Sequence, residues 1–135
     1  FENFESRKNA IKTSIKILTD DNLKFIFNSN SVAEVPFQIK IPEVSNTVFS
    51  GVIDRIINYE ESVLAIDFKS NFLVPKLVSE VPDGILQQMA VYFRSLEILY
   101  PEKKVAIAIL WTETSNLMFL DNATLRNSLQ SVLNT

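Results

Sequence analysis

The stretch SVLAIDFKS, residues 62–70, decides the predicted fold, because it is an apolar run rich in β-branched residues that ends in an acid and a lysine. Side chains alternate between the two faces of a strand, so Asp67 and Lys69 are expected on the same face. A charge inside an apolar strand costs several kcal/mol unless it is paired or binds a metal. The stretch therefore predicts a strand with a charged site at its end.

The preceding run, VFSGVIDRIIN, has the same β-branched character and contains a second acid, Asp54. The polar stretch 58–61 separates the two runs, and this pattern predicts a β-hairpin. Two acids and a lysine at neighbouring strand ends are typical of a site for a hard divalent cation, with the lysine beside the reacting centre. The simpler alternative is a surface ion pair between Asp67 and Lys69, with Asp54 as a turn residue near Arg55.

The rest of the chain predicts helices around these strands. A polar N-terminal helix carries an apolar stripe and a row of lysines at i, i+4 and i+8, and a short second helix follows Asp20. A long helix is predicted between Pro82 and Pro101, with its apolar stripe packed into the sheet, and a last helix over 122–133. The N-terminal stripe is Phe4, Ile11, Ile15 and Leu18, the lysines are Lys8, Lys12 and Lys16, and the long helix presents Ile85, Met89, Leu96 and Leu99.

Three further strands complete the predicted order α-α-β-β-β-α-β-β-α. The strand around Pro36 is predicted at an edge or to be irregular, because proline lacks the backbone N–H that a central strand donates to its neighbour. KKVAIAILWT is apolar on both faces and is expected in the middle of a sheet that is covered on both sides. A short strand, NLMFL, follows it. We expect one α/β domain over 1–135, with a helical lead-in at 1–30 and a core at 31–135.

The composition excludes several classes of chemistry. The chain has no His and no Cys, which excludes Ser-His-Asp and Cys-His catalysis from its own residues, disulfides and thiolate metal sites. A net charge of −3 argues against a dedicated nucleic-acid-binding module, although a local basic surface is compatible with it. No apolar run approaches the roughly 18 residues that a membrane span requires, so we expect a cytoplasmic protein and no membrane partner.

The acids and lysine belong to an ordered series of short motifs. The series is Ala33-Glu34-Val35-Pro36, Gly51-Val52-Ile53-Asp54-Arg55, Ile66-Asp67-Phe68-Lys69-Ser70-Asn71, Gln88-Met89-Ala90-Val91-Tyr92, Tyr100-Pro101 and Ala108-Ile109-Leu110-Trp111-Thr112. In this order it resembles the RecB-type PD-(D/E)xK nuclease domains, and most closely the C-terminal part of AddA from alphaproteobacterial-type AddAB helicase-nucleases. The resemblance implies a restriction-endonuclease-like fold, a mixed central sheet flanked by helices.

The resemblance also implies a role for each matching residue. Asp54 and Asp67 would be carboxylate ligands of Mg²⁺ or Mn²⁺, together with the backbone carbonyl of Phe68. Lys69 would orient the attacking water or stabilise charge on the phosphate. Three supporting positions complete the implied site: Glu34, which is equally compatible with plain solvent exposure, and Gln88 and Tyr92 of a QxxxY motif, of which Tyr92 also fits a packing role.

The implied activity is metal-dependent hydrolysis of DNA phosphodiester bonds by an exonuclease that serves double-strand break repair. Relatives carry an additional histidine ligand upstream, which this sequence lacks, so we expect a piece truncated at its N-terminal side that is inactive alone. ATP would be used only by a helicase part outside these residues, and DNA and an AddB-like subunit are the expected partners. The alternatives are a degenerate nuclease fold that binds DNA or a partner without cutting, and a purely structural domain.

Overall fold

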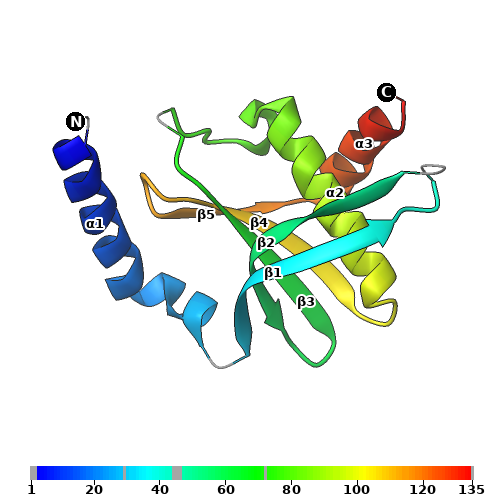
Figure 1. Ribbon diagram of the computed structural model, residues 1–135, viewed down its shortest axis with the longest axis horizontal. Coiled ribbons are helices and arrows are strands. Elements are labelled where there is room, and N and C mark those ends of the chain that lie inside the picture. Colours follow the sequence, from blue (N-terminus) through cyan, green and yellow to red (C-terminus); the bar gives the residue numbers. More distant parts are fainter. Residues whose placement is uncertain (1–2, 29, 44–46, 72, 135) are drawn as a thin grey trace.

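The computed structural model describes residues 3–28, 30–43, 47–71 and 73–134, with side chains from residue 7 onward. Figure 1 shows the helices α1 (Asn3–Thr19), α2 (Asp83–Leu99) and α3 (Asn122–Leu133), and the short 3₁₀ helices are η1 (Asp21–Phe27) and η2 (Val78–Glu80). The strands are β1 (Ser31–Lys40), β2 (Val48–Asn58), β3 (Ser62–Lys69), β4 (Lys104–Trp111) and β5 (Asn116–Leu120). This is the predicted order of elements, with η2 added.

These strands form one mixed sheet in the order β1-β2-β3-β4-β5. All neighbours are antiparallel except β3 and β4, which run parallel because the helix α2 crosses between them. The predicted hairpin of β2 and β3 is confirmed. The edge position predicted from Pro36 is also confirmed, since Pro36 lies in β1.

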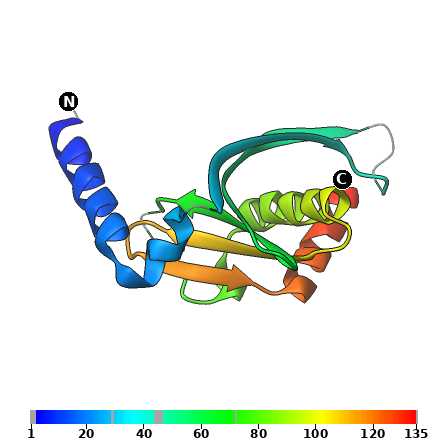
Figure 2. The ribbon, with the colours of Figure 1, turned by 90° about the horizontal axis from the view of Figure 1, so that it is seen from below.

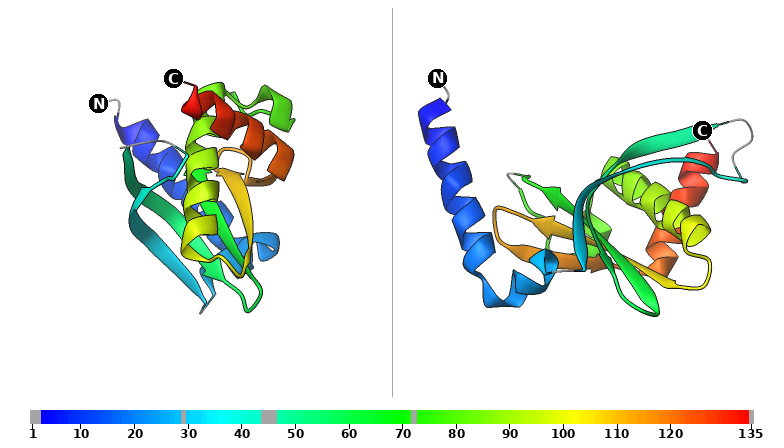
Figure 3. Two further views of the ribbon diagram at one scale, coloured as in Figure 1. Left: turned by 90° about the vertical axis from the view of Figure 1, so that its right-hand side faces the viewer. Right: turned by 60° about the horizontal axis from the view of Figure 1, so that its bottom comes forward.

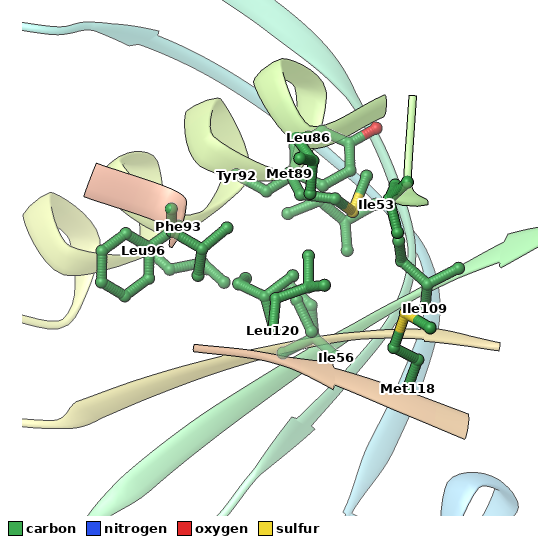
Figure 4. Close-up of a cluster of buried hydrophobic side chains, with 14 of the residues drawn as sticks. Ile53, Ile56, Leu86, Met89, Tyr92, Phe93, Leu96, Ile109, Met118 and Leu120 are labelled. Carbon is green, nitrogen blue, oxygen red and sulfur yellow. The ribbon is translucent and has the colours of Figure 1, made fainter. Parts of the chain in front are cut away.

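The hydrophobic core lies on both faces of the sheet. On one face, β3, β4 and β5 pack against α2, and the cluster in Figure 4 joins Met89, Phe93 and Leu96 of the helix to Ile109 and Leu120 of the strands. On the other face, Leu64, Ile66, Ala108 and Leu110 pack against Ile17, Leu23 and Ile26 from α1 and η1. The prediction that β4 is a central strand covered on both sides is therefore confirmed.

The strands β1 and β2 form a curved ribbon that arches over α2 (Figure 2). Phe37 on this ribbon contacts Tyr92 of α2 edge to face, with ring centroids 5.5 Å apart. The approach is possible because Gly51, which pairs with Phe37 across the ribbon, has no side chain. A Cβ at Gly51 would lie 3.1 Å from the Phe37 ring.

The helix α1 extends away from the body of the protein (Figures 1 and 3). Its predicted apolar stripe does not pack into the core: Ile11, Ile15 and Leu18 are 60%, 56% and 58% exposed, and Ile17 is buried instead. The side chain of Phe4 lies outside the described residues. The expectation that Leu99 packs into the sheet is also wrong, because this last residue of α2 is 53% exposed. None of the described helices combines the length and apolar character needed to cross a bilayer.

We predict opposite effects for alanine at the two glycines. Gly51→Ala should lower the free energy of unfolding by about 1 kcal/mol, because the new methyl group crowds the Phe37 ring. Gly84→Ala, the matched control, should raise it by up to about 1 kcal/mol, since Gly84 is helical and nothing lies within 4 Å of the position. Urea denaturation measures both values. An unchanged or higher stability of Gly51→Ala would contradict the close packing of the ribbon on α2.

Candidate active site

The two acids lie where β2 and β3 separate. The last paired residues of the two strands are Arg55 and Ile66, and Asp54 and Asp67 are the next residues on each strand. Beyond this fork β2 continues with β1 alone, while β3 remains paired with β4. The Phe68 N–H donates to Asp54 Oδ2 at 2.7 Å, so a carboxylate takes the place of a strand carbonyl.

Asp67 and Lys69 form an ion pair at the end of β3. Lys69 Nζ lies 3.0 Å from Asp67 Oδ2, as the alternation of side chains along the strand predicts. The pair is not the surface contact of the simpler alternative, because the Asp67 residue is only 4% exposed. A buried carboxylate of this kind loses hydration, and the nearby ammonium offsets part of that loss.

The environment of Asp67 favours its neutral form. Burial raises the pKa of Asp67 to about 6, the Lys69 ammonium opposes this increase, and the negative charge of Asp54 adds to it. The negative charge of Asp54 acts on Asp67, and Asp54 also accepts from the N–H of Phe68, the residue after Asp67, so the two carboxyl groups lie close together. The structure thus brings Asp54, Asp67 and Lys69 together at one end of the sheet.

A chain of hydrogen bonds leads from Lys69 to the long helix. Lys69 Nζ donates to Gln88 Oε1 at 2.9 Å, and Gln88 Nε2 donates to the Tyr92 hydroxyl at 2.9 Å. The Tyr92 hydroxyl donates to the Val52 carbonyl of β2 at 3.3 Å. Gln88 therefore contacts the ion pair directly, while Tyr92 supports Gln88.

Tyr92 takes the packing role of its two predicted roles. It is buried and packs against Phe37, and its hydroxyl bonds to Gln88 and Val52 and not to either acid. Burial raises the pKa of the Tyr92 hydroxyl, and the charge of Asp67 adds to the shift. The ring is thus a packing residue whose polar end lies within the electric field of the acids.

Glu34 lies in the edge strand at the level of Asp54. Its neighbours Ala33 and Val35 pair with Arg55 and Ile53, yet Glu34 itself is exposed and has a backbone φ of 52°. A non-glycine residue in this left-handed region stores about 1–3 kcal/mol of strain, and such strain often occurs near functional sites. Among the described residues, no group of three or more Asp, Glu, His or Cys is placed to hold a metal ion.

Sequence reasoning missed the contribution of Thr112 as a support of the site. The Thr112 N–H donates to the Lys69 carbonyl at 2.9 Å, and its hydroxyl donates to the same oxygen at 3.3 Å. These bonds fix the end of β3, from which the Lys69 side chain extends. The ending Leu110-Trp111-Thr112 of the apolar strand is visible in the sequence. The contact of Thr112 with Lys69, however, follows only from the parallel pairing of β3 and β4.

The site residues fit a divalent cation held through oxygen. Two adjacent carboxylates, one of them with a pKa raised by burial and further by its negative neighbour, form a place where added positive charge is favourable. Mg²⁺ commonly takes one or two carboxylates from a protein and completes its shell with water and substrate phosphate. The donor set of Asp54 and Asp67 meets this requirement, whereas it is too small for a cation that needs an all-protein cage.

Comparison with known proteins identifies relatives only at the level of structure. No protein-family model matches the chain, and no curated protein matches it. The crystal structure of a candidate exonuclease from Eubacterium rectale matches with a TM-score of 0.66 and 17% identity, over 95% of this chain and 50% of that one. The chain therefore shares the fold of the matched part of that structure. It spans half the length of that exonuclease structure.

A second solved structure, that of the protein SSO0001, matches with a TM-score of 0.46 and 19% identity, over 96% of this chain and 66% of the other. This similarity is too low to support an argument. The predicted α/β fold with a mixed sheet flanked by helices is confirmed by the first structure. The assignment of the individual site residues is not tested by either structure, and it stays a prediction.

We predict that Asp67 makes stability depend on pH between about 4 and 7. The pKa of Asp67 is raised to about 6 in the folded state, against about 3.9 in an unfolded chain, so its stabilising contribution is complete below pH 4 and is lost as the pH rises through 6. Relative to Asp67→Asn, the wild-type protein should therefore gain about 1 kcal/mol in the free energy of unfolding between pH 7.5 and pH 5. Urea denaturation at both pH values measures the difference, and parallel pH profiles would contradict a raised pKa.

A second prediction concerns the strain at Glu34. Glycine normally destabilises a strand relative to alanine, but a φ of 52° favours glycine at this position. Glu34→Gly should therefore be more stable than Glu34→Ala by about 1 kcal/mol in urea denaturation. The usual order, with alanine more stable, would show that the left-handed backbone is absent in solution.

Proposed function

We propose that this chain is the nuclease domain of a metal-dependent DNA exonuclease, which hydrolyses phosphodiester bonds. The observation that carries the proposal is the meeting of Asp54, Asp67 and Lys69 at the β2 and β3 fork, with the ammonium 3.0 Å from a buried carboxylate. The nuclease fold supports it as a second, independent observation. Phosphoryl chemistry at such a site needs charge neutralisation and positioning more than a protein nucleophile, which agrees with the absence of His and Cys.

Each residue has a distinct role in the proposal. Asp54 and Asp67 would hold Mg²⁺ or Mn²⁺, with the Phe68 backbone carbonyl as a further oxygen ligand. When bound, the cation would neutralise phosphate charge and lower the pKa of a coordinated water. Lys69 would orient that water or stabilise the charge that develops on the phosphate. Gln88 holds the Lys69 ammonium at 2.9 Å, and Tyr92 holds Gln88 at 2.9 Å, so both act as positioning residues.

We further propose that the domain belongs to a bacterial, cytoplasmic helicase-nuclease of the AddA type, which acts in double-strand break repair. The support is the ordered series of motifs from Ala33 to Thr112. In such a protein ATP would be bound by the helicase part, and the partners would be DNA and an AddB-like subunit. Glu34 would then support the site from the edge strand.

One observation favours a second candidate, a nuclease fold that binds DNA or a partner subunit without cutting. Within the described residues the site offers two carboxylates and no cluster of three metal-ligating side chains. A metal held by two side chains depends on substrate phosphate for its remaining ligands. If the upstream histidine ligand does not exist in the natural protein, cleavage would be weak or absent.

The test is cleavage of labelled DNA by the natural full-length protein with Mg²⁺ or Mn²⁺ and with EDTA. We expect cleavage that requires the metal and falls by about 100-fold or more in Asp67→Ala and in Lys69→Ala, because each change removes a ligand or a charge from the reacting centre. ATP-driven unwinding should persist in both variants. The isolated chain is expected to show little or no cleavage.

Lys104→Ala is the matched control for Lys69→Ala. It removes the same charge from an exposed position at the opposite end of the sheet, where Lys104 pairs with Ser62. Its cleavage rate should equal that of the wild type. Variants of Asp67 and Lys69 that cut at the wild-type rate would refute the nuclease mechanism, and DNA binding without any cleavage in the wild type would favour the second candidate.

A further inference from the structure

The ribbon of β1 and β2 is anchored at its base and extends from there over α2 (Figure 2). At the base, Arg55 Nε donates to the Ile26 carbonyl at 3.0 Å and to the Ser31 hydroxyl at 2.7 Å. Arg55 is also the residue at which the pairing of β2 with β3 ends, since it lies opposite Ile66. A two-stranded ribbon is only marginally stable by itself, so contacts with α2 must keep its outer part in place.

Both strands of the ribbon are irregular just beyond this base. In β1, Glu34 has a left-handed backbone with a φ of 52°, and in β2, Asp54 at the same level has left the pairing with β3. Irregular positions bend a strand, and a few such positions absorb the change of backbone angles when an element rotates. A ribbon that is fixed at Arg55 is therefore expected to pivot at the level of Asp54, one of the two candidate metal ligands.

The far end of the ribbon is tied to the helices by an ion pair. Arg94 of α2 donates from Nε to Glu43 Oε2 at 2.7 Å and from Nη2 to Glu43 Oε1 at 3.1 Å. Two parallel bonds from one guanidinium form a strong charge-assisted contact, and they hold the pKa of Glu43 below its usual range. Glu97 of α2 lies 3.5 Å from Arg94, and Arg126 of α3 donates to Glu97 at 2.6 Å. The end of the ribbon is thus connected to both helices.

The ion pair lies far from the pivot, which makes it effective against rotation of the ribbon. Asp54 and Val48, the first residue of β2, are six positions apart, or about 20 Å along the strand. At that distance from the pivot, a small displacement of the ribbon corresponds to a small angle. The Tyr92 hydroxyl, by contrast, contacts the Val52 carbonyl, which is two positions from Asp54. Contacts close to the pivot restrict the angle less strongly than the pair of Glu43 and Arg94.

The two acids of the candidate site provide a force that opens the fork. The negative charge of Asp54 raises the pKa of Asp67, which means that the two carboxylates repel each other when both are ionised. Rotation of the ribbon away from α2 would separate them, and it would break the hydrogen bond from the Phe68 N–H to the Asp54 carboxylate. Opening of the fork can therefore be followed at this N–H.

We propose that the ion pair of Glu43 and Arg94 is a latch, which holds the ribbon on α2 and thereby keeps Asp54 beside Asp67 against their repulsion. Glu43 and Arg94 are positioning residues for the candidate site, although they lie at the far end of the ribbon. Because their side chains are 36% and 25% exposed, the latch weakens as the ionic strength rises. The inference rests on the proposed function for the role of Asp54, and it adds a control over the assembly of the site.

Hydrogen exchange of the full-length protein in EDTA, measured by mass spectrometry of its peptides, tests the latch. One peptide covers the end of β3 with the Phe68 N–H, and a second covers the centre of β4, which pairs with a strand on each side and reports overall unfolding. Glu43→Gln removes the charge and keeps the size of the side chain. Glu60→Gln, the matched control, removes the same charge from an exposed position in the turn between β2 and β3.

We expect Glu43→Gln to accelerate exchange at the end of β3 about threefold or more without changing exchange in β4, and Glu60→Gln to change neither. Arg94→Lys keeps the charge but not the two parallel bonds, so its rate should lie between those of the wild type and Glu43→Gln. Adding Glu43→Gln to Arg94→Gln should not accelerate exchange further, because the pair is already broken. A rise from about 0.05 M to about 0.5 M NaCl should accelerate exchange at the end of β3 more in the wild type than in Glu43→Gln.

The outcomes separate the latch from the proposed function. Unchanged exchange at the end of β3 in Glu43→Gln, or equal acceleration in β3 and β4, would overturn the latch even if the protein cuts DNA. Excess Mg²⁺ should slow exchange at the end of β3 in the wild type and in Glu43→Gln alike, because a cation bound by both acids favours the closed fork. If Mg²⁺ has no effect and no DNA is cut, the proposed function fails, while faster exchange of Glu43→Gln in EDTA still supports the latch.

Discussion

The separation of β2 from β3 is the constraint on which the rest of the structure depends. At this fork the Phe68 N–H donates to the Asp54 carboxylate at 2.7 Å. This donor near the end of β3 therefore keeps a hydrogen-bond acceptor where β2 no longer pairs with β3. An unsatisfied buried N–H would cost about 1–3 kcal/mol, and a carboxylate acceptor makes the replacement bond a strong one. The divergence lets β1 and β2 arch over α2, and it leaves Asp54 beside Asp67.

The helix α2 connects the two sides of this fork. Its Gln88 accepts from Lys69 of β3, and its Tyr92 donates to the Val52 carbonyl of β2, so one helical turn links both strands. Residues four apart lie on the same face of a helix, which is why a single element can make both contacts. The ion pair of Asp67 and Lys69 is therefore positioned by Thr112, which follows β4, and by Gln88 of α2.

Local periodicity in the sequence determined most of the fold and part of the site. The β-branched runs, the i, i+3 and i, i+4 spacing of Met89, Tyr92 and Leu96, and the edge position of Pro36 all follow from short-range sterics and hydrogen bonding. The common face of Asp67 and Lys69 follows from the two-residue period of a strand, and the common face of Gln88 and Tyr92 from the helical period. Each of these relations involves residues that are close in the sequence.

Only the tertiary structure decided the relations between distant residues. Strand register and the bend of β2, which no local pattern encodes, determine three of these features. They are the hydrogen bond from Phe68 to Asp54, the left-handed backbone of Glu34 and the hydrogen bond from Thr112 to the Lys69 carbonyl. The exposure of Ile11, Ile15 and Leu18 could not be predicted from the sequence either. An apolar stripe indicates which side of a helix favours burial, but not whether another part of the protein packs against that side. Periodicity fixes the direction of a side chain relative to its own element, and the packing of elements fixes what that side chain meets.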